Sequence, residues 1–223
     1  MSEPLSDDLL RGLPHVLPIF PLEGALLLPH GHLPLHIFEP RYRSMVEHAL
    51  GRGRMIGMIQ PRSPYPHPVP DDADIFTLGC AGRIVSFSES EDSRFLITLK
   101  GVCRFRVIEE LPPQCGFRRV MPDYGPFHGD FGALIEEGID RERLLDAARA
   151  FLKLKAIDCD WNAVQAAPTA ALVTAFAMTC PLEPREKQAL LECESFLERA
   201  EMLISLFAMA VLESDAQPSR SEH

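Results

Sequence analysis

Residues 33–43 read Leu-Pro-Leu-His-Ile-Phe-Glu-Pro-Arg-Tyr-Arg, and this stretch decides the fold because its period changes from that of a strand to that of a helix. In its first half, the apolar residues Leu35 and Ile37 stand at alternate positions, which is typical of a half-buried strand. Pro40 then occupies a position where a helix tolerates proline, its first residue, because the missing N–H would be unpaired there anyway. The stretch therefore predicts a strand followed at once by a helix over residues 40–50.

The predicted helix has one apolar face. Its apolar residues recur at spacings of three and four: Tyr42, Met45, Val46, Ala49 and Leu50. Such spacing places them on one side of a helix, and glycines at positions 51 and 53 end it. We expect this face to lie against the strands that surround it.

Together with the segment before it, this stretch resembles the opening of the substrate-binding domain found at the N-terminus of ATP-dependent Lon proteases. The resemblance begins in the run Leu-Pro-Ile-Phe-Pro-Leu-Glu-Gly of residues 17–24 and departs from the family pattern at Glu23 and at His30-Gly31-His32. It continues in residues 101–108 and 186–192. The residues to which the resemblance gives a structural role are Phe20, Pro21, Leu22, Gly24, Pro34, His36, Phe38, Glu39, Pro40, Gly101 and Phe105.

The resemblance, which covers most of residues 13–213, implies an α+β fold. We expect a small pseudo-barrel of about six β-strands, PUA-like, with one inserted helix, followed by an α-helical subdomain. Strand-like runs come first and helical patterns afterwards, which agrees with two parts of different class. The expected boundaries are a disordered tail over 1–12, the barrel over 13–122, a linker over 123–138, the helical subdomain over 139–213 and a disordered tail over 214–223.

Within the barrel, the apolar runs predict strands bounded by proline and glycine. The expected strands cover residues 16–20, 25–28, 33–38, 54–60, 77–88, 94–100, 102–108 and 117–121. Gly101 is expected to form a step between two of them. The proline-rich and aspartate-rich segment 61–74 predicts a solvated, mobile loop.

The charge of the chain is uneven. The formal net charge is −10, and residues 121–223 hold 18 acidic against 9 basic residues, a balance of −9. Without a basic stripe, the chain is poorly suited to phosphate backbones, so nucleic acid is disfavoured as a partner. The six cysteines are scattered, and no signal peptide or apolar run of membrane-spanning length is present, which predicts a cytoplasmic protein that does not cross a membrane.

Catalytic motifs are missing from the sequence. The phosphate-binding run G-x-x-x-x-G-K-[ST] does not occur, and no spacing joins a cysteine to a histidine that could activate it. We therefore expect no enzyme, no catalytic residue and no cofactor. His30, His32 and His36 could converge on a metal ion, but a glycine turn separates the first two, and a structural role is favoured, so no metal site is predicted.

Six residues are candidates for contacts with a substrate or partner: Arg41, Tyr42, Arg43, Tyr65, Phe127 and Phe131. The first three follow Glu39, and pairing within the fold is the favoured interpretation of these arginines. Tyr65 lies in the proline-rich loop. The two phenylalanines stand among glycines, where they either connect the two parts or form an exposed apolar patch.

By resemblance, the function is non-catalytic recognition of protein, by binding of unfolded or exposed apolar segments. The acidic second half would add a preference for basic segments that weakens with salt. Two alternatives remain open: a scaffold that binds one folded partner or itself, and a PUA-like module that binds a small ligand or RNA.

Overall fold

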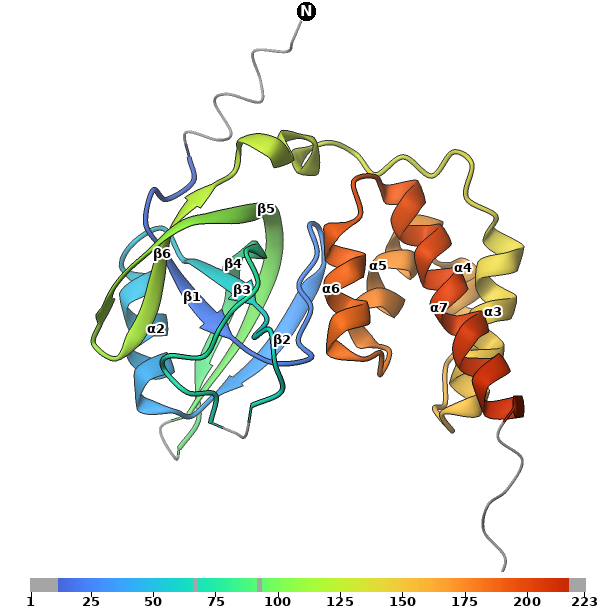
Figure 1. Cartoon of the computed structure of the whole chain (residues 1–223), viewed down its shortest axis with the longest axis horizontal. Helices are drawn as coiled ribbons and strands as arrows, with labels where there is room; N and C mark the ends of the chain where they lie inside the picture. Colours follow the sequence, from blue (N-terminus) through green and yellow to red (C-terminus); the bar gives the residue numbers. More distant parts are fainter. Residues whose placement is uncertain (1–11, 66–67, 92–93, 217–223) are drawn as a thin grey trace, which may run out of the picture. The chain divides into compact units, whose positions relative to one another are not determined.

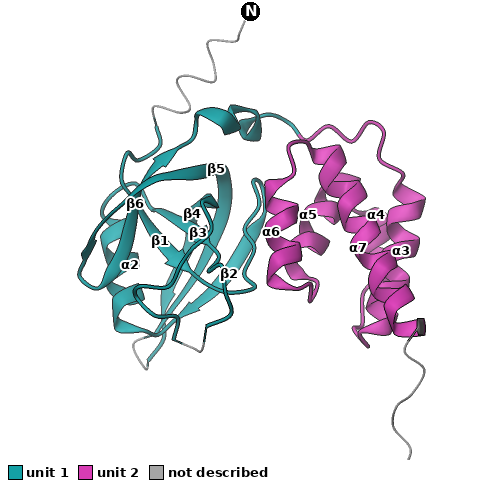
Figure 2. Cartoon of the chain, in the orientation of Figure 1, with its two compact units in different colours: residues 1–133 teal, residues 134–223 magenta. Residues whose placement is uncertain are grey.

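The computed structural model describes residues 12–65, 68–91 and 94–216. The chain divides into two compact units, residues 1–133 and residues 134–223 (Figure 2). The boundary falls inside the segment 123–138. All but the last residue of the N-terminal tail expected over 1–12 lies outside the described residues, and so do residues 217–223 of the expected C-terminal tail.

The first unit is built on a six-stranded mixed sheet (Figure 1). Its strands are β1 (Leu17–Pro21), β2 (His32–Ile37), β3 (Met55–Ile59), β4 (Leu78–Glu89), β5 (Phe95–Gln114) and β6 (Phe117–Asp123). Their order is β2-β5-β4-β3-β1-β6, and β5 also pairs with β6. Only β1 and β3 run parallel. The predicted α+β class and strand number are confirmed, although the sheet is not a regular barrel, because β2 lies outside the ring of strands that β5 and β6 close.

Three of the expected strands differ in the structure. The segments 94–100 and 102–108 belong to one strand, residues 95–114, which Gly101 does not interrupt. The chain around Leu28 approaches the strand closely at Gly101. A Cβ atom at Gly101 would lie 1.9 Å from the backbone oxygen of Leu28. Residues 25–28 form no strand, and their three leucines are buried without strand pairing.

Phe105 lies at the centre of the first unit's core and is fully buried. Two glycines make room for its ring, since a Cβ atom on Gly57 of β3 or Gly79 of β4 would lie within 3 Å of it. Side chains from β1 and β6, including Leu17 and Val120, complete the same cluster. The alternation in residues 101–108 thus directs Phe105 inward.

Helix α2 (Pro40–Leu50) has the bounds that the sequence predicts. Its buried residues are Tyr42, Met45, Val46 and Ala49. The rings of Tyr42 and Phe20 lie 4.1 Å apart between their centroids, which joins the helix to β1. The single apolar face therefore covers the sheet, as its spacing indicates.

The 3-10 helix η1 (Gly125–Phe131) follows β6 and is fixed to the sheet. Asp130 pairs with Arg104 of β5, and the thiol of Cys103 lies 3.5 Å from the carbonyl oxygen of Phe127. Phe127 and Phe131 both pack against the core cluster of the first unit. The described segment before Ala133 is therefore part of the first unit.

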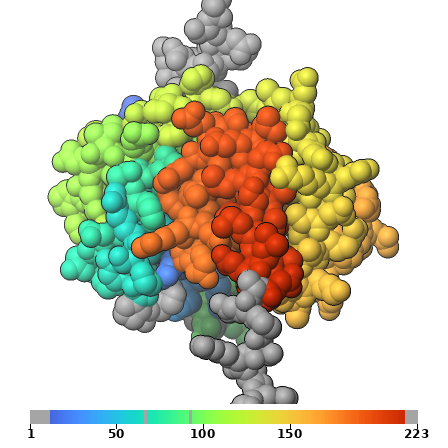
Figure 3. Space-filling model, turned by 45° about the vertical axis from the view of Figure 1, so that its right-hand side comes forward, coloured from blue at the N-terminus to red at the C-terminus, as the bar shows by residue number. Residues whose placement is uncertain are grey.

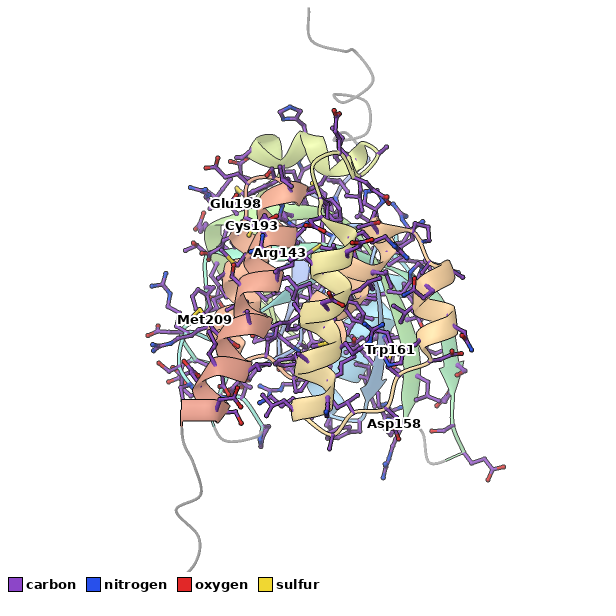
Figure 4. The ribbon with its side chains drawn as sticks, turned by 90° about the vertical axis from the view of Figure 1, so that its right-hand side faces the viewer. Arg143, Asp158, Trp161, Cys193, Glu198 and Met209 are labelled. Atoms are coloured by element: carbon purple, nitrogen blue, oxygen red, sulfur yellow. The ribbon has the colours of Figure 1, made fainter. Side chains whose placement is uncertain are left out.

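The second unit is helical. Its helices are α3 (Arg141–Leu154), α4 (Trp161–Ala166), α5 (Thr169–Thr179), α6 (Pro184–Glu192) and α7 (Phe196–Ala216). Phe207 of α7 stacks on Phe151 of α3 at 4.5 Å between ring centroids. These two helices lie side by side (Figure 3). Arg143 of α3, which Figure 4 labels, forms an exposed ion pair with Glu201 of α7. No helix in the described ranges combines the length and apolarity needed to cross a membrane.

Candidate functional site

The outer face of β2 carries exposed side chains that alternate with inward ones. His32, Pro34 and His36 are exposed, whereas Ile37 is buried. β2 pairs with β5 alone and forms the end of the described sheet, so one of its edges has no strand partner there. Proline is tolerated in a strand of this kind because its missing N–H can face away from the neighbouring strand.

A hollow of about 380 Å³ lies on this outer face. Register brings three strands together there: His36 lies opposite Leu96 of β5, and Leu96 lies opposite Ser88 of β4. We call it the outer-face hollow, and its lining residues are Pro34, Leu35, His36, Ser86, Ser88, Leu96, Ile97 and Thr98. Leu96 is 48% exposed on the middle strand of the three.

The apolar surface continues past the end of β2. Phe38 is 61% exposed, and its ring centroid lies 6.1 Å from that of His36. Among the described residues, none that lines the hollow is an aspartate, glutamate, lysine or arginine. Exposed apolar side chains with a neutral polar surround are typical of surfaces that bind other molecules.

Arg41 and Tyr42 are in contact, with the guanidinium 4.5 Å from the ring centroid, whereas Arg43 contacts a different ring. Arg41 pairs with Glu39 and Asp71 and donates to the carbonyl oxygen of Val69 at 2.8 Å. Tyr42 is 5% exposed, and burial raises the pKa of its hydroxyl to about 12. The guanidinium of Arg43 lies 4.9 Å from the ring centroid of Phe95. Each side chain is thus engaged within the first unit.

Tyr65, Phe127 and Phe131 also make contacts within the first unit. The hydroxyl oxygen of Tyr65 accepts from the amide of Asp74 at 3.2 Å, inside the loop that both residues belong to. The ring centroid of Phe127 lies 5.0 Å from the guanidinium of Arg104. The six candidate residues are therefore not brought together at one site.

The proline-rich loop is anchored, not only solvated. Val69 and Ala73 are buried, and the carbonyl oxygen of Ala73 accepts from Arg118 at 2.7 Å. The expectation of a solvated loop is wrong for these two residues, because arginines of α2 and β6 bind their backbone. Residues 66–67 lie outside the described part.

The residues assigned a structural role fall into two groups. Phe20, Pro21 and Phe105 are buried, the amide of Leu22 donates to Ile59, and Gly24 has a φ of +72° that favours glycine. In contrast, Pro34, His36 and Phe38 are exposed at the outer face. The sequence did not indicate a role at the hollow for four of its lining residues, Leu96, Ser86, Ser88 and Thr98. The signal available for Leu96 was its position between Phe95 and Ile97, which alternation directs inward.

The three histidines are separated as well. His32 and His36 lie on the outer face of β2, whereas His30 precedes the strand with a φ of +67°. Within the described ranges, no group of three or more histidine, cysteine, aspartate or glutamate side chains is placed to hold a metal ion.

Comparison with known proteins gives a consistent result. The sequence profile of the ATP-dependent protease La (LON) substrate-binding domain matches residues 16–208. The Lon protease of Dictyoglomus thermophilum is 33% identical over 108 residues, which are 48% of this chain and 13% of that protein. The chain thus corresponds to a small part of the length of that relative.

Two solved structures share the fold. The Lon N-terminal domain protein from Xanthomonas campestris has a TM-score of 0.56 and 23% identity, covering 85% of this chain and 97% of that one. The N-terminal domain of Mycobacterium avium complex Lon protease has a TM-score of 0.57 and 15% identity, covering 86% and 98%. At these identities the likeness concerns the fold alone.

Proposed function

Because the chain belongs to the LON substrate-binding domain family, we propose that it recognises polypeptide without changing it chemically. On this proposal it binds unfolded segments, or apolar segments exposed on other proteins, at the outer-face hollow. The absence of a phosphate-binding motif and of a nucleophile with its base in the sequence supports a non-catalytic role. Its site of action would be the cytoplasm.

The observation that carries the proposal is the exposure of Leu96 and Phe38 beside a hollow at the edge strand whose described lining residues include no charged side chain. Apolar side chains of an extended segment would lose water against Leu96, Pro34 and Phe38. Burial of apolar area contributes roughly 25 cal/mol per Å². The free edge of β2 offers backbone groups that can pair with the same segment, which is a common mode of peptide binding.

The test uses one charged substitution in the hollow and one outside it. Leu96→Asp places a carboxylate in the hollow, and Ile108→Asp places one at an exposed apolar residue of β5 that does not line it. We expect Leu96→Asp to weaken the binding of a reduced, carboxymethylated protein about tenfold or more, which corresponds to about 1.4 kcal/mol. Ile108→Asp should bind as the wild type does.

Equal loss in both variants, or no binding by the wild type, would contradict the proposal. A competition experiment distinguishes this proposal from a scaffold that binds one folded partner. An excess of denatured protein should displace a labelled apolar peptide from the hollow. It should not displace a dedicated folded partner. Self-association is tested by the mass of the wild type in solution.

The acidic balance of residues 121–223 adds a second expectation. A basic unfolded peptide should bind more tightly than a neutral one at low salt, and the difference should shrink as salt rises, because exposed charges are screened. If the difference in affinity between the basic and the neutral peptide does not change with salt, the preference does not come from this acidic charge.

A further inference from the structure

A second pocket of the first unit, of about 270 Å³, shares no residue with the outer-face hollow. Its lining residues come from the end of α2, the chain that enters and forms β1, the start of β3 and the adjoining parts of β5 and β6. We call it the basic pocket, and its lining residues are Pro14, Val16, Pro18, His48, Ala49, Arg52, Met55, Gln114 and Arg119. None of these described lining residues is acidic.

Arg119 is held in a fixed orientation at the pocket. Its Nε donates to the carbonyl oxygen of Pro112 at 2.9 Å, and its Nη1 donates to Oε1 of Gln114 at 3.0 Å. A guanidinium has five N–H groups, so donors remain on a side chain that is already half-buried and oriented. Preorganised guanidinium groups of this kind suit carboxylates.

The arginines of the first unit differ in their partners. Arg41, Arg104 and Arg118 each pair with a carboxylate. Within the described ranges, Arg52 and Arg119 have no carboxylate partner. The two cationic side chains at the basic pocket therefore retain capacity for an anion from outside the unit.

The hydrogen bond with Gln114 determines which ring nitrogen of His48 carries the proton. Because Oε1 of Gln114 accepts from Arg119, its Nε2 is the atom that faces Nδ1 of His48 at 3.3 Å. Nδ1 then accepts, and the ring proton lies on Nε2. Burial and the charges of Arg52 and Arg119 lower the pKa of His48, so the ring is neutral near pH 7. It adds a donor without adding a charge.

The rest of the lining is apolar and stiff. Pro14, Val16 and Pro18 come from the chain entering and forming β1, and Ala49 and Met55 are the other apolar residues of the lining. The pocket has room for one carboxylate and one apolar side chain of moderate size. It is smaller than most sites for larger ligands. Charge and apolar contact are thus available within one small space.

We propose that the basic pocket binds the free C-terminal carboxylate of a polypeptide whose last side chain is apolar. In such a ligand, the carboxylate and the apolar side chain are attached to the same Cα atom. This arrangement fits a pocket in which guanidinium groups lie next to apolar side chains. An internal aspartate or glutamate is followed and preceded by further residues of the chain, and the pocket volume is too small for both. Phosphate groups carry no apolar part, and polyanions are disfavoured by a net charge of −10. The inference rests on the proposed function only in taking polypeptide as the ligand.

The experiment compares two short labelled peptides that end in leucine, one with a free carboxylate and one amidated. We expect the free acid to bind the full-length protein about tenfold or more tightly, as a charge-assisted pair allows. Arg119→Gln should reduce its affinity to that of the amide and leave the amide unchanged. Arg106→Gln, at an exposed arginine of β5 outside the pocket, is the matched control.

Thermal unfolding of each variant shows whether the fold is kept, and the double variant Arg52→Gln with Arg119→Lys, which retains one positive charge, provides a second measurement. Equal affinity for acid and amide, or displacement of the peptide by acetate or inorganic phosphate at equal concentration, would overturn the proposal. Leu96→Asp separates the two sites. If it abolishes binding of denatured protein but spares the difference between acid and amide, both proposals stand. If denatured protein fails to bind the wild type while the difference persists, only the proposed function fails.

Discussion

Arg104 of β5 and Asp130 of η1 form a buried ion pair, with Nη2 of the arginine 2.8 Å from Oδ1 of the aspartate. The same carboxylate accepts from the backbone N–H of Arg104 at 2.8 Å and from its Nε. Arg104 is 7% exposed and Asp130 9%. One aspartate thus fixes the segment after β6 to the sheet by side chain and backbone together.

Removing Asp130 should therefore destabilise the first unit strongly. Asp130→Ala leaves the charge of Arg104 buried without its partner, which typically costs about 3–5 kcal/mol of unfolding free energy. Asp146→Ala is the control, because its pair with Arg149 is exposed and should contribute about 1 kcal/mol or less. Urea unfolding followed by circular dichroism measures both, and similar losses would show that the burial of the pair does not matter.

Gly101→Ala tests the close approach of residue 101 to the chain around Leu28. The new Cβ atom would meet backbone atoms at 1.9 and 2.7 Å, and the hydrogen bonds of Gly101 with His30 and Gly31 hold the two segments together. We expect a loss of at least about 1–3 kcal/mol, as for overpacked cores. Gly129→Ala meets no atom within 4 Å and should stay within about 0.5 kcal/mol of the wild type.

His48 should make the stability depend on pH in a defined range. Its pKa in the folded protein lies below 6.5, first because of burial and then because of Arg52 and Arg119. The unfolded chain therefore binds this proton more readily, so the free energy of unfolding falls as pH drops through about 6.5 and levels off below the folded pKa. His48→Gln should lose less stability between pH 7.5 and 5. A titration of the His48 ring by NMR with a midpoint above 6.5 would contradict the assignment.

The six cysteines should differ sharply in reactivity. Cys115 is exposed in the turn between β5 and β6, whereas Cys80, Cys103, Cys180 and Cys193 are buried. Burial raises the pKa of Cys103 and of Cys180 to about 12, so neither forms the reactive thiolate at pH 8. A disulfide reagent at pH 8 should modify Cys115 rapidly, and Cys115→Ser should remove this phase. Rapid modification of the four buried thiols without denaturant would show that these regions open readily.

Much of the fold follows from local sequence patterns. Pro40 and Gly51 mark the ends of α2, the spacing from Tyr42 to Leu50 gives its buried face, and alternation in residues 101–108 places Phe105 inside. The assignment of Gly101 to a step between strands failed, because the reason for a glycine there is an approach by residues distant in sequence. Likewise Arg41 and Arg43 are close in sequence but have separate surroundings, since Arg41 pairs with Asp71 and Arg43 lies over the ring of Phe95.

The sequence by itself determined most of the strands and helices and their order, because hydrophobic period is a property of neighbours along the chain, although residues 25–28 form no strand. Only the tertiary structure decided that Leu96 lies between His36 and Ser88, and that Arg119 reaches Gln114 beside His48. Both sites depend on strand register and on the packing of a helix end against a turn. These are set by contacts between distant segments, for which alternation along one strand carries no information.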